Sequence, residues 1–395
     1  MNKAILSEEV QQYLWENENT EISRFILSGS PFKAVTAAEL AQQLEGRKKA
    51  KQKLPFWYEH RGIYYPPKLN IEQTSSQATA RYKADLIGKE KLLIDITGGV
   101  GIDAYFFSLQ HQEIIHCEIN DEISQIAAHN FKILEARHIK TVTGDGIAYL
   151  ENSQTHFDTI YVDPSRRNES KGKVFMLKDC LPNIPEKIGL LLSKSSQILV
   201  KTSPLLDISA GLSELSNVAE IHIVAVNNEV KELLWLLKNG AKKTDFTLKT
   251  ANILADKIDF TTVNYQDAIK STANFAPVKK FLFEPNAALL KSGLFNWIGK
   301  AYGLDKLHPN THLYTSNIIT DFPGRVFKVL EVMPFNKKII LKKWSGKKAN
   351  ITTRNFKIPV ESLRKKFKIK DGGETYLFFC TDIDNSPIVV VCKKA

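Results

Sequence analysis

Residues 91–254 alternate between apolar runs and amphipathic helical patterns, and this alternation limits the fold more than any other feature of the chain. Short apolar runs that end in polar or glycine-containing turns predict buried strands: KLLIDITG, EIIHCEIN, TVTGD, DTIYVDP, QILVKTSP and VAEIHIVAV. Helical patterns lie between several of these runs, and we also predict a helix for EVKELLWLLK. The pattern predicts an α/β fold, in which a parallel sheet has helices on both faces and ligands at the carboxyl ends of its strands.

Four regions follow from the patterns along the rest of the chain. We predict a helical region in residues 1–72 and place the sheet in residues 73–255. Residues 275–320 and 321–395 mix short strands with helices and predict two small α+β modules.

The N-terminal region contains a helix with a recognisable start. Thr36 is followed three residues later by Glu39, which predicts an N-cap. The basic run from Arg47 to Lys53 precedes the aromatic residues 56–58. Basic residues beside aromatic ones suit single-stranded nucleic acid, but a charged helix end followed by an apolar anchor explains the run as well, and we favour that interpretation.

The positive charge is concentrated at the end of the chain. The protein has 54 basic and 43 acidic residues, a net charge of +11, and residues 321–395 hold 17 of the basic and 7 of the acidic ones. A solvated basic face would account for this, but a nearly neutral body with a basic module fits a polyanion better, and we expect RNA as partner.

Several functional classes are disfavoured. The four cysteines are far apart and predict neither a disulfide framework nor a zinc site, so we expect no metal and a reducing, cytoplasmic location. We also expect no membrane segment, because no apolar run approaches about 18 residues.

The glycine-rich turn after the first predicted strand favours a nucleotide cofactor. Asp95, Thr97, Gly99 and Gly101 lie between this strand and the next helix. Glycines let a ligand approach the backbone closely, and the following helix N-terminus offers free N–H donors to an anionic group. Asp95 can accept a hydrogen bond from a cationic group of the ligand.

Acidic residues end the next three predicted strands. Glu118 follows Asp95 by 23 residues, where a carboxylate can accept hydrogen bonds from both ribose hydroxyls. Asp145 ends the third strand, where it can receive an adenine amino group, and Asp163 ends the fourth. Together with Asp95, these acids describe a pocket for an adenosine-type cofactor.

Residues 91–204, with these motifs, resemble a class I S-adenosylmethionine-dependent methyltransferase, whose sheet is Rossmann-like. The resemblance implies that Asp95, Thr97, Gly99 and Gly101 hold the methionine part of S-adenosylmethionine, with Thr97 in place of the first glycine usual in the family. It also implies that Glu118 holds the ribose, Asp145 the adenine, and the motif at Asp163 faces the methyl acceptor.

Further motifs resemble one bacterial group of these methyltransferases over about residues 55–393. The motifs are QATARYKA before the first strand, DPSRR after the fourth, FEPN, and the C-terminal SLRKKFKIKDGGETYLF. The resemblance implies a small ferredoxin-like module at 275–320 and a THUMP-like domain at 321–395.

The acceptor motif favours direct methyl transfer. Asp163 can accept an N–H from a target amine, as can the carbonyl of Pro164. Ser165 and Arg166 stand where related enzymes carry a proline and an aromatic residue, and Arg166 or Arg167 can hold a phosphate. Lys201 is a further candidate for an acceptor contact, or else a snorkelling lysine at a sheet edge. Because no cysteine is suitably placed, Cys180 included, we disfavour a thiolate nucleophile.

The leading hypothesis is therefore a methyltransferase that uses S-adenosylmethionine to methylate RNA, either rRNA or tRNA. An alternative keeps the cofactor but takes a small molecule or a protein as substrate. An NAD-binding oxidoreductase would explain Glu118 but would leave Asp145 and DPSRR without roles. A non-catalytic RNA-binding protein would not need the four acids.

Overall fold

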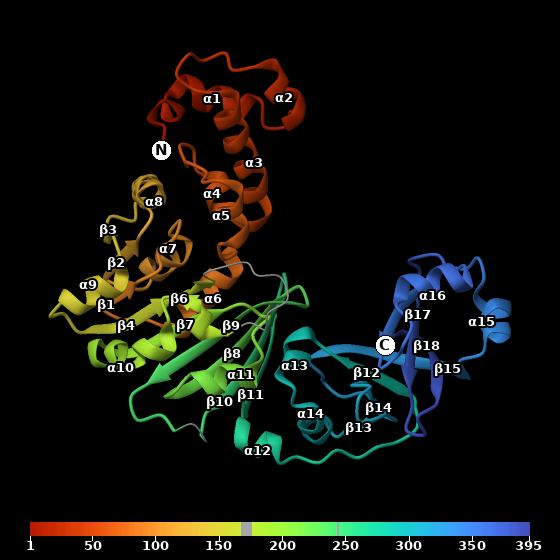
Figure 1. Cartoon of the computed structure of the whole chain (residues 1–395). Helices are drawn as coiled ribbons and strands as arrows, with labels where there is room; N and C mark the ends of the chain where they lie inside the picture. Colours follow the sequence, from red (N-terminus) through yellow and green to blue (C-terminus); the bar gives the residue numbers. More distant parts are fainter. Residues whose placement is uncertain (167–175, 243–244) are drawn as a thin grey trace. The chain divides into compact units, whose positions relative to one another are not determined.

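A computed structural model of the protein describes residues 1–166, 176–242 and 245–395 (Figure 1). The chain forms two compact units, Met1–Ala219 with Leu233–Lys243, and Glu220–Glu232 with Thr244–Ala395. Among the described residues, no helix combines the length and the apolar character that crossing a membrane requires.

The first unit begins with a predominantly helical region. Its elements are η1 (Lys3–Leu6), α1 (Glu8–Glu16), α2 (Ile22–Ser28), α3 (Ala37–Lys53), α4 (Pro55–Glu59), α5 (Lys68–Gln73) and α6 (Gln77–Ile87). The predicted N-cap is confirmed as a capping box, because Thr36 Oγ1 accepts from Glu39 N at 3.2 Å and a Glu39 carboxylate oxygen accepts from Thr36 N at 2.8 Å.

The basic run of α3 is used within the fold. Lys48 Nζ donates to the carbonyl of Thr20 at 2.6 Å, and Lys53 Nζ donates to that of Ile71 at 2.9 Å. Phe56 and Trp57, which follow the run, are buried. These contacts agree with the interpretation of a charged helix end followed by an apolar anchor.

The sheet of the first unit has the order β9-β7-β4-β1-β2-β3. All of its pairings are parallel except that of β9 with β7. The strands are β1 (Leu92–Asp95), β2 (Glu113–Glu118), β3 (Ile139–Thr143), β4 (Phe157–Val162), β7 (Ser195–Thr202) and β9 (Glu229–Lys238). The first five predicted strands and the mainly parallel α/β architecture are thus confirmed.

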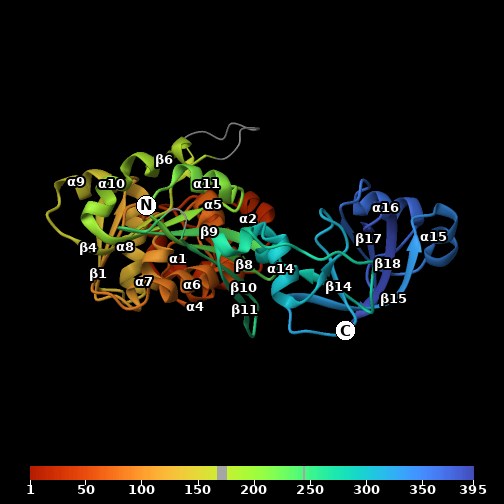
Figure 2. The same ribbon diagram turned by 90° about the horizontal axis from the view of Figure 1, so that it is seen from below.

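Helices cover both faces of this sheet. Figure 2 shows α6 and α7 on one side, with α9, α10 and α11 on the other. The connecting elements are α7 (Ile102–Ser108), α8 (Asp121–Ile133), α9 (Gly146–Asn152), β5 (Ser165–Arg166), η2 (Leu177–Asp179), β6 (Cys180–Leu181), α10 (Ile184–Lys194) and α11 (Ile208–Glu214). Strands buried on both faces need apolar side chains in both directions, which is why Leu93 and Ile94 of β1 are both fully buried.

The helix predicted for EVKELLWLLK is wrong, because the segment forms strand β9. The five apolar residues 233–237 have no periodicity that separates a buried helix from a buried strand. The turn before them decides the structure: Asn227 and Asn228 have φ values of 50° and 63°, and they form a two-residue link from β8 (Val218–Val226). Two left-handed residues of this kind start a hairpin, not a helix.

The second unit contains the pairings β8-β10-β11 and a separate seven-stranded sheet of order β13-β14-β12-β15-β18-β17-β16. The helices α15 and α16 contact each other (Figure 1). The remaining elements of the unit are β10 (Thr247–Ile253), β11 (Ile258–Asn264), α12 (Tyr265–Ile269), β12 (Phe281–Pro285), α13 (Ala287–Ser292), α14 (Phe295–Tyr302), β13 (Asp305–Lys306), β14 (Tyr314–Ser316), β15 (Gly324–Pro334), α15 (Lys337–Trp344), β16 (Asn350–Arg354), α16 (Val360–Phe367), β17 (Thr375–Thr381) and β18 (Pro387–Lys394).

Candidate active site

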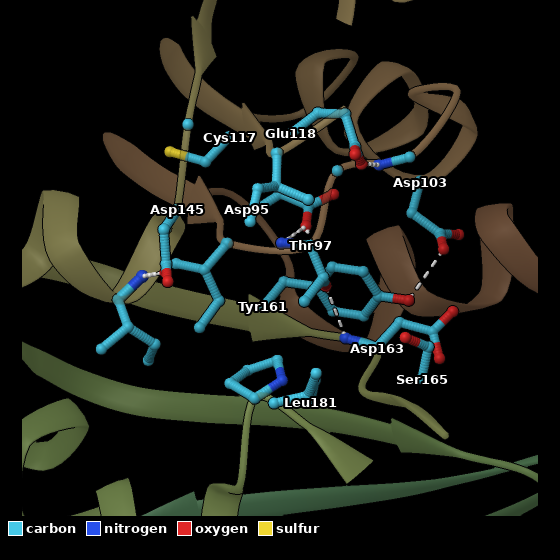
Figure 3. Close-up of a pocket in the computed structure, with 18 of the residues that line it drawn as sticks. Asp95, Thr97, Asp103, Cys117, Glu118, Asp145, Tyr161, Asp163, Ser165 and Leu181 are labelled. Carbon is cyan, nitrogen blue, oxygen red and sulfur yellow. Dashed lines mark hydrogen bonds between the residues drawn. The ribbon is translucent and has the colours of Figure 1, made fainter. Parts of the chain in front are cut away.

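A cavity of about 760 Å³ lies at the carboxyl ends of β1, β2, β3 and β4 (Figure 3). The four strand-end acids expected from the sequence all line it: Asp95, Glu118, Asp145 and Asp163. Parallel strands bring their carboxyl ends to one edge of a sheet, and this is why acids up to 68 positions apart in the chain meet in one cavity.

In the glycine turn, Gly98 and Gly101 are packed against side chains, whereas Gly99 has free space around it. A Cβ on Gly98 would lie 2.3 Å from the His116 ring, and a Cβ on Gly101 would lie 2.3 Å from Phe131. Gly101 has φ 81° and caps α7, but it does not line the cavity. Gly99 has φ 54° and does line the cavity. Among the described residues other than its two chain neighbours, the atom nearest to a Cβ at this position would be the carbonyl oxygen of Thr97, at 3.9 Å. A ligand can therefore approach the backbone closely at Gly99.

The Glu118 carboxylate is held by two backbone amides. Gly99 N donates to Oε2 at 2.8 Å, and Asn120 N donates to Oε1 at 2.7 Å. Each carboxylate oxygen has room for a second hydrogen bond, so Glu118 retains acceptor capacity toward the cavity. The first of these bonds also ties the glycine turn to the end of β2.

Thr97 joins the glycine turn to the acceptor motif (Figure 3). Its Oγ1 accepts from Asp163 N at 2.7 Å and donates to Asp95 Oδ1 at 3.4 Å, while Thr97 N donates to the same oxygen at 3.0 Å. A glycine at this position would lack the hydroxyl that makes both side-chain bonds.

Asp95 is almost completely buried. Burial raises its pKa well above the ordinary value of 3.8, and the charges of Asp103, Asp163 and Glu118 act in the same direction, against the hydrogen bond from Thr97 N. The cavity therefore favours a ligand that brings a positive charge to this end.

Asp145 starts helix α9 as its N-cap. Its Oδ1 accepts from Ile147 N at 2.7 Å and from Ala148 N at 3.4 Å. Behind it, a Cβ on Gly146 would lie 2.5 Å from the carbonyl oxygen of Ile96, so only glycine fits there. The acid expected at the adenine thus has a fixed orientation at the cavity wall.

Asp163 is paired with Lys201 of β7 through its Oδ2. Lys201 lies on a strand that has neighbours on both sides, so the interpretation as a sheet-edge lysine is wrong. Ser165 lines the cavity beside Asp163, whereas Pro164 is buried and does not line it. The side chain of Arg166 and the whole of Arg167 lie outside the described residues.

Sequence reasoning missed a buried ionic network beside these residues. Asp103 Oδ2 accepts from Tyr161 OH at 2.7 Å and from Ser75 Oγ at 2.8 Å, and Lys83 Nζ lies 3.3 Å from Asp103 Oδ1. Burial opposes ionisation of Asp103, but the positive charges of Lys83 and Lys201 and these hydrogen bonds outweigh it and lower its pKa.

One sequence signal for this network existed. In the predicted strand DTIYVDP, Tyr161 precedes Asp163 by two residues, and residues two apart in an extended segment face the same side. Lys83 and Ser75 have no such signal, because α6 and its preceding turn reach the cavity only through the tertiary fold.

The cavity also has apolar walls. Ile119 and Leu181 line it although their side chains are largely exposed, at 72% and 52%. Asn183 lies next to this wall at the N-cap of α10. Among the described residues it makes no capping hydrogen bond, and its buried Oδ1 has no hydrogen-bond partner. A planar ring with polar edges would cover the apolar side chains and supply the amide with a partner.

The cysteines are buried. Burial is the largest cause that raises the pKa of Cys117 to about 12, although this residue lines the cavity. Cys180 lies in β6, with its Sγ 3.6 Å from the carbonyl oxygen of Met176. Among the described residues there is also no group of three side chains suited to a metal ion.

A mainly parallel sheet with a glycine turn and acids at successive strand ends defines an enzyme that binds a nucleotide-type cofactor. Comparison with known proteins narrows this class. A protein of Porphyromonas gingivalis W83, whose crystal structure is described as that of a methyltransferase, is 32% identical to this chain in sequence. The two structures match with a TM-score of 0.90 over 100% of this chain and 98% of that one.

Two curated relatives come from Mycobacterium tuberculosis, strains CDC 1551 / Oshkosh and H37Rv, and are named uncharacterized S-adenosylmethionine-dependent methyltransferases. Each is 22% identical over 316 residues, which cover 76% of this chain and 80% of the relative. Family models match a ferredoxin-like domain at residues 281–323 and a THUMP domain-like module at residues 324–394. The chain belongs to the S-adenosylmethionine-dependent methyltransferases, in the group that carries these two modules.

Proposed function

We propose that this methyltransferase, with S-adenosylmethionine as its cofactor, methylates RNA by direct transfer to an acceptor held at Asp163. The observation that carries the proposal is that one cavity contains both the glycine turn with Glu118 and the acceptor motif with Ser165. A cofactor and an acceptor atom bound at the two parts of this cavity would be neighbours.

The residues of the cavity fit the cofactor. The open backbone at Gly99 can approach the ligand, and Glu118 keeps acceptor capacity for ribose hydroxyls. Ile119 and Leu181 offer apolar contact to the adenine ring. The buried, raised-pKa carboxyl of Asp95 suits the positively charged methionine end.

The bound cofactor supplies an electrophilic methyl group on a sulfonium. The part of the protein is to bring an acceptor lone pair into line with it, and such positioning can contribute roughly 7–11 kcal/mol. Asp163 can accept an N–H of the acceptor through an oxygen that Lys201 orients. The buried cysteines support direct transfer over a covalent thiolate route.

RNA as the substrate is supported by the basic charge of residues 321–395 and by the THUMP domain-like module that covers most of them. The test is methylation of RNA from cells that lack this gene, with labelled S-adenosylmethionine and mass spectrometry of the nucleosides. We expect one methylated nucleoside to be absent from the deletion strain and restored by the purified protein.

The Asp163→Asn variant should abolish this transfer while S-adenosylhomocysteine binding, measured by calorimetry, changes by no more than a few-fold. The matched control Asp121→Asn, on the exposed start of α8, should behave as the wild type. Methylation of a protein or a small molecule with RNA unmodified would refute the RNA part of the proposal.

A further inference from the structure

One segment of the second unit has a nearly uniform positive charge. Residues 337–370, from the start of α15 to the turn after α16, contain thirteen basic residues and a single acidic one, Glu361. At this density most of the charges cannot be neutralised within the segment.

The arginines and the lysines of this segment behave differently. Arg354 pairs with Glu284 at 2.8 Å, and Arg364 pairs with Asp371. Among the lysines, Lys343 pairs with Glu331. The other ten have exposed side chains and no carboxylate within ion-pair distance in the part of the chain that the structure describes: Lys337, Lys338, Lys342, Lys347, Lys348, Lys357, Lys365, Lys366, Lys368 and Lys370.

Four of these lysines are held together by backbone pairing, and we call them the lysine cluster: Lys347, Lys348, Lys368 and Lys370. Lys370 N donates to the carbonyl of Lys347 at 2.8 Å, and Gly346 N donates to that of Lys368 at 2.9 Å. Lys348 and Lys370 also form a parallel bridge. Two segments whose paired residues are 22 or 23 positions apart therefore place like charges next to each other, an arrangement that repulsion disfavours in the free protein.

Helix stability does not explain the other exposed lysines. Lys337 and Lys338 occupy the first turn of α15, which contains no acid. Cations there oppose the positive end of the helix dipole. Lysines in the last turns of α15 and α16, and Lys368 at the C-cap of α16, would be favoured by the dipole. The lysines in the first turn of α15 and the other three of the lysine cluster require another reason.

The surface has phosphate-binding groups but no stacking platform. Every aromatic side chain of residues 324–394 is buried or half-buried, and Trp344 and Phe367 pack into the core beneath α15 and α16. Proteins that bind single strands stack bases on aromatic rings, whereas double-helical RNA is recognised mainly through its backbone and shape.

We propose that the lysine cluster and the outward sides of α15 and α16 bind the phosphate backbone of double-helical RNA. The inference rests on the proposed function and deepens it: the basic module would bind a double-helical stem of the substrate RNA through its phosphates, without sequence specificity. Lysine suits this role because it acts as a point charge that needs no fixed bidentate geometry.

The test compares two variants of the full chain that carry the same charge change. The cluster variant replaces the four lysines of the lysine cluster by glutamine. The matched control replaces four exposed lysines elsewhere in the second unit, which also have no ion pair: Lys270, Lys280, Lys328 and Lys394. Thermal unfolding of both variants verifies the fold, and a second cluster variant with only Lys347→Gln and Lys370→Gln serves if the fourfold variant fails to fold.

Fluorescence anisotropy with a 20-base-pair RNA duplex, over a series of salt concentrations, is the measurement. We expect the cluster variant to bind the duplex at least 10-fold more weakly than the wild type, with a log–log salt slope flatter by about 3–4, or roughly 0.9 for each lost phosphate contact. The control should stay within about 2-fold of the wild type.

Three outcomes would overturn the inference. Equal losses in the cluster variant and the control would mean that net charge alone attracts RNA. Tighter wild-type binding to a 20-nucleotide single strand, or to vesicles of anionic lipid, would mean a different partner. If the cluster variant binds the duplex as the wild type does, while nucleoside analysis still shows RNA methylation, the role of this surface in RNA binding would be refuted and the proposed function would stand.

Discussion

Asp95 is a buried acid of the site that has no ion pair among the described residues. Lys83 and Lys201 act on Asp103, Lys201 pairs with Asp163, and Glu118 accepts two backbone amides. For Asp95 the hydrogen bonds in the described residues come from Thr97 alone. The residue keeps a buried carboxyl at a cost in stability, as expected for a group that a cationic ligand neutralises.

Asp95→Asn should therefore stabilise the protein without cofactor and weaken cofactor binding. The folded pKa of Asp95 lies above its unfolded value of 3.8, so its stabilising contribution is present at low pH and lost as the pH rises through the folded pKa. The gain in unfolding temperature of the variant should thus be larger at pH 8 than at pH 5. S-adenosylhomocysteine should bind at least 10-fold more weakly by calorimetry; an unchanged affinity would contradict the role of the acid.

Thr97→Val should lower the rate of methyl transfer about 5- to 10-fold, because Asp163 N loses its acceptor and one hydrogen bond contributes about 1 kcal/mol. Thr97→Ser keeps the hydroxyl and should restore the rate. Single-turnover methylation of the RNA substrate measures this effect. Cofactor affinity should change little in both variants, and an equal defect in the serine variant would show that the methyl group, not the hydroxyl, matters.

At the scale of elements, α6 and α7 are joined to the sheet by buried charges. Lys83 of α6 is fully buried and lies 3.3 Å from Asp103 of α7, which accepts from Tyr161 of β4. Packing and charge thus hold the two helices in place beside the cavity. A buried pair of this kind is destabilising when one partner is lost, because the other charge stays behind.

Lys83→Met should lower the free energy of unfolding by about 3–5 kcal/mol at neutral pH. In the wild type, the folded pKa of Asp103 is below its ordinary value of 3.8, so its contribution is present above that value and lost as the pH falls through the folded pKa. In the variant, this loss of stability with falling pH should be absent. Urea unfolding at several pH values tests both points, with the exposed Lys89→Met as control; equal stability of the two variants would contradict the expectation.

At the scale of the whole molecule, residues 281–316 and 324–394 share one sheet. Strand β12 pairs with β15, and a common core contains Leu282, Leu307 and Leu313 from the first segment with Phe327 and Phe378 from the second. The module boundary predicted near residue 321 therefore lies within a continuous sheet and core, and the division of the chain into domains stays a prediction.

A chain that ends at Thr320 should be insoluble or unfold at a much lower temperature. It would expose the three core leucines named above, each worth about 1.5–3 kcal/mol when buried, and would leave β12 without its partner β15. Thermal unfolding of the soluble fraction is the measurement, and a chain that lacks only Ala395 is the control. A truncated chain with full stability would show that the two segments fold independently.

Features that depend on residues close together in the chain could be predicted from the sequence. Strand, turn and helix follow one another within about 20 residues, so the parallel sheet and the acids Asp95, Glu118, Asp145 and Asp163 could be predicted to meet at one edge. The capping box of α3 was predictable for the same reason, since its two partners are three residues apart.

Features whose parts are distant in the chain, or that lack a periodic pattern, depend on contacts that form in the folded protein. The apolar run of β9 fits a buried helix and a buried strand equally, and the left-handed pair before it made the choice. The ion pair of Asp163 with Lys201 depends on the pairing of β4 with β7, and the approach of Lys83 to Asp103 depends on the packing of α6 against α7. The lysine cluster exists because two loops pair through their backbones, and charge patterns along a chain do not reveal such contacts between its distant segments.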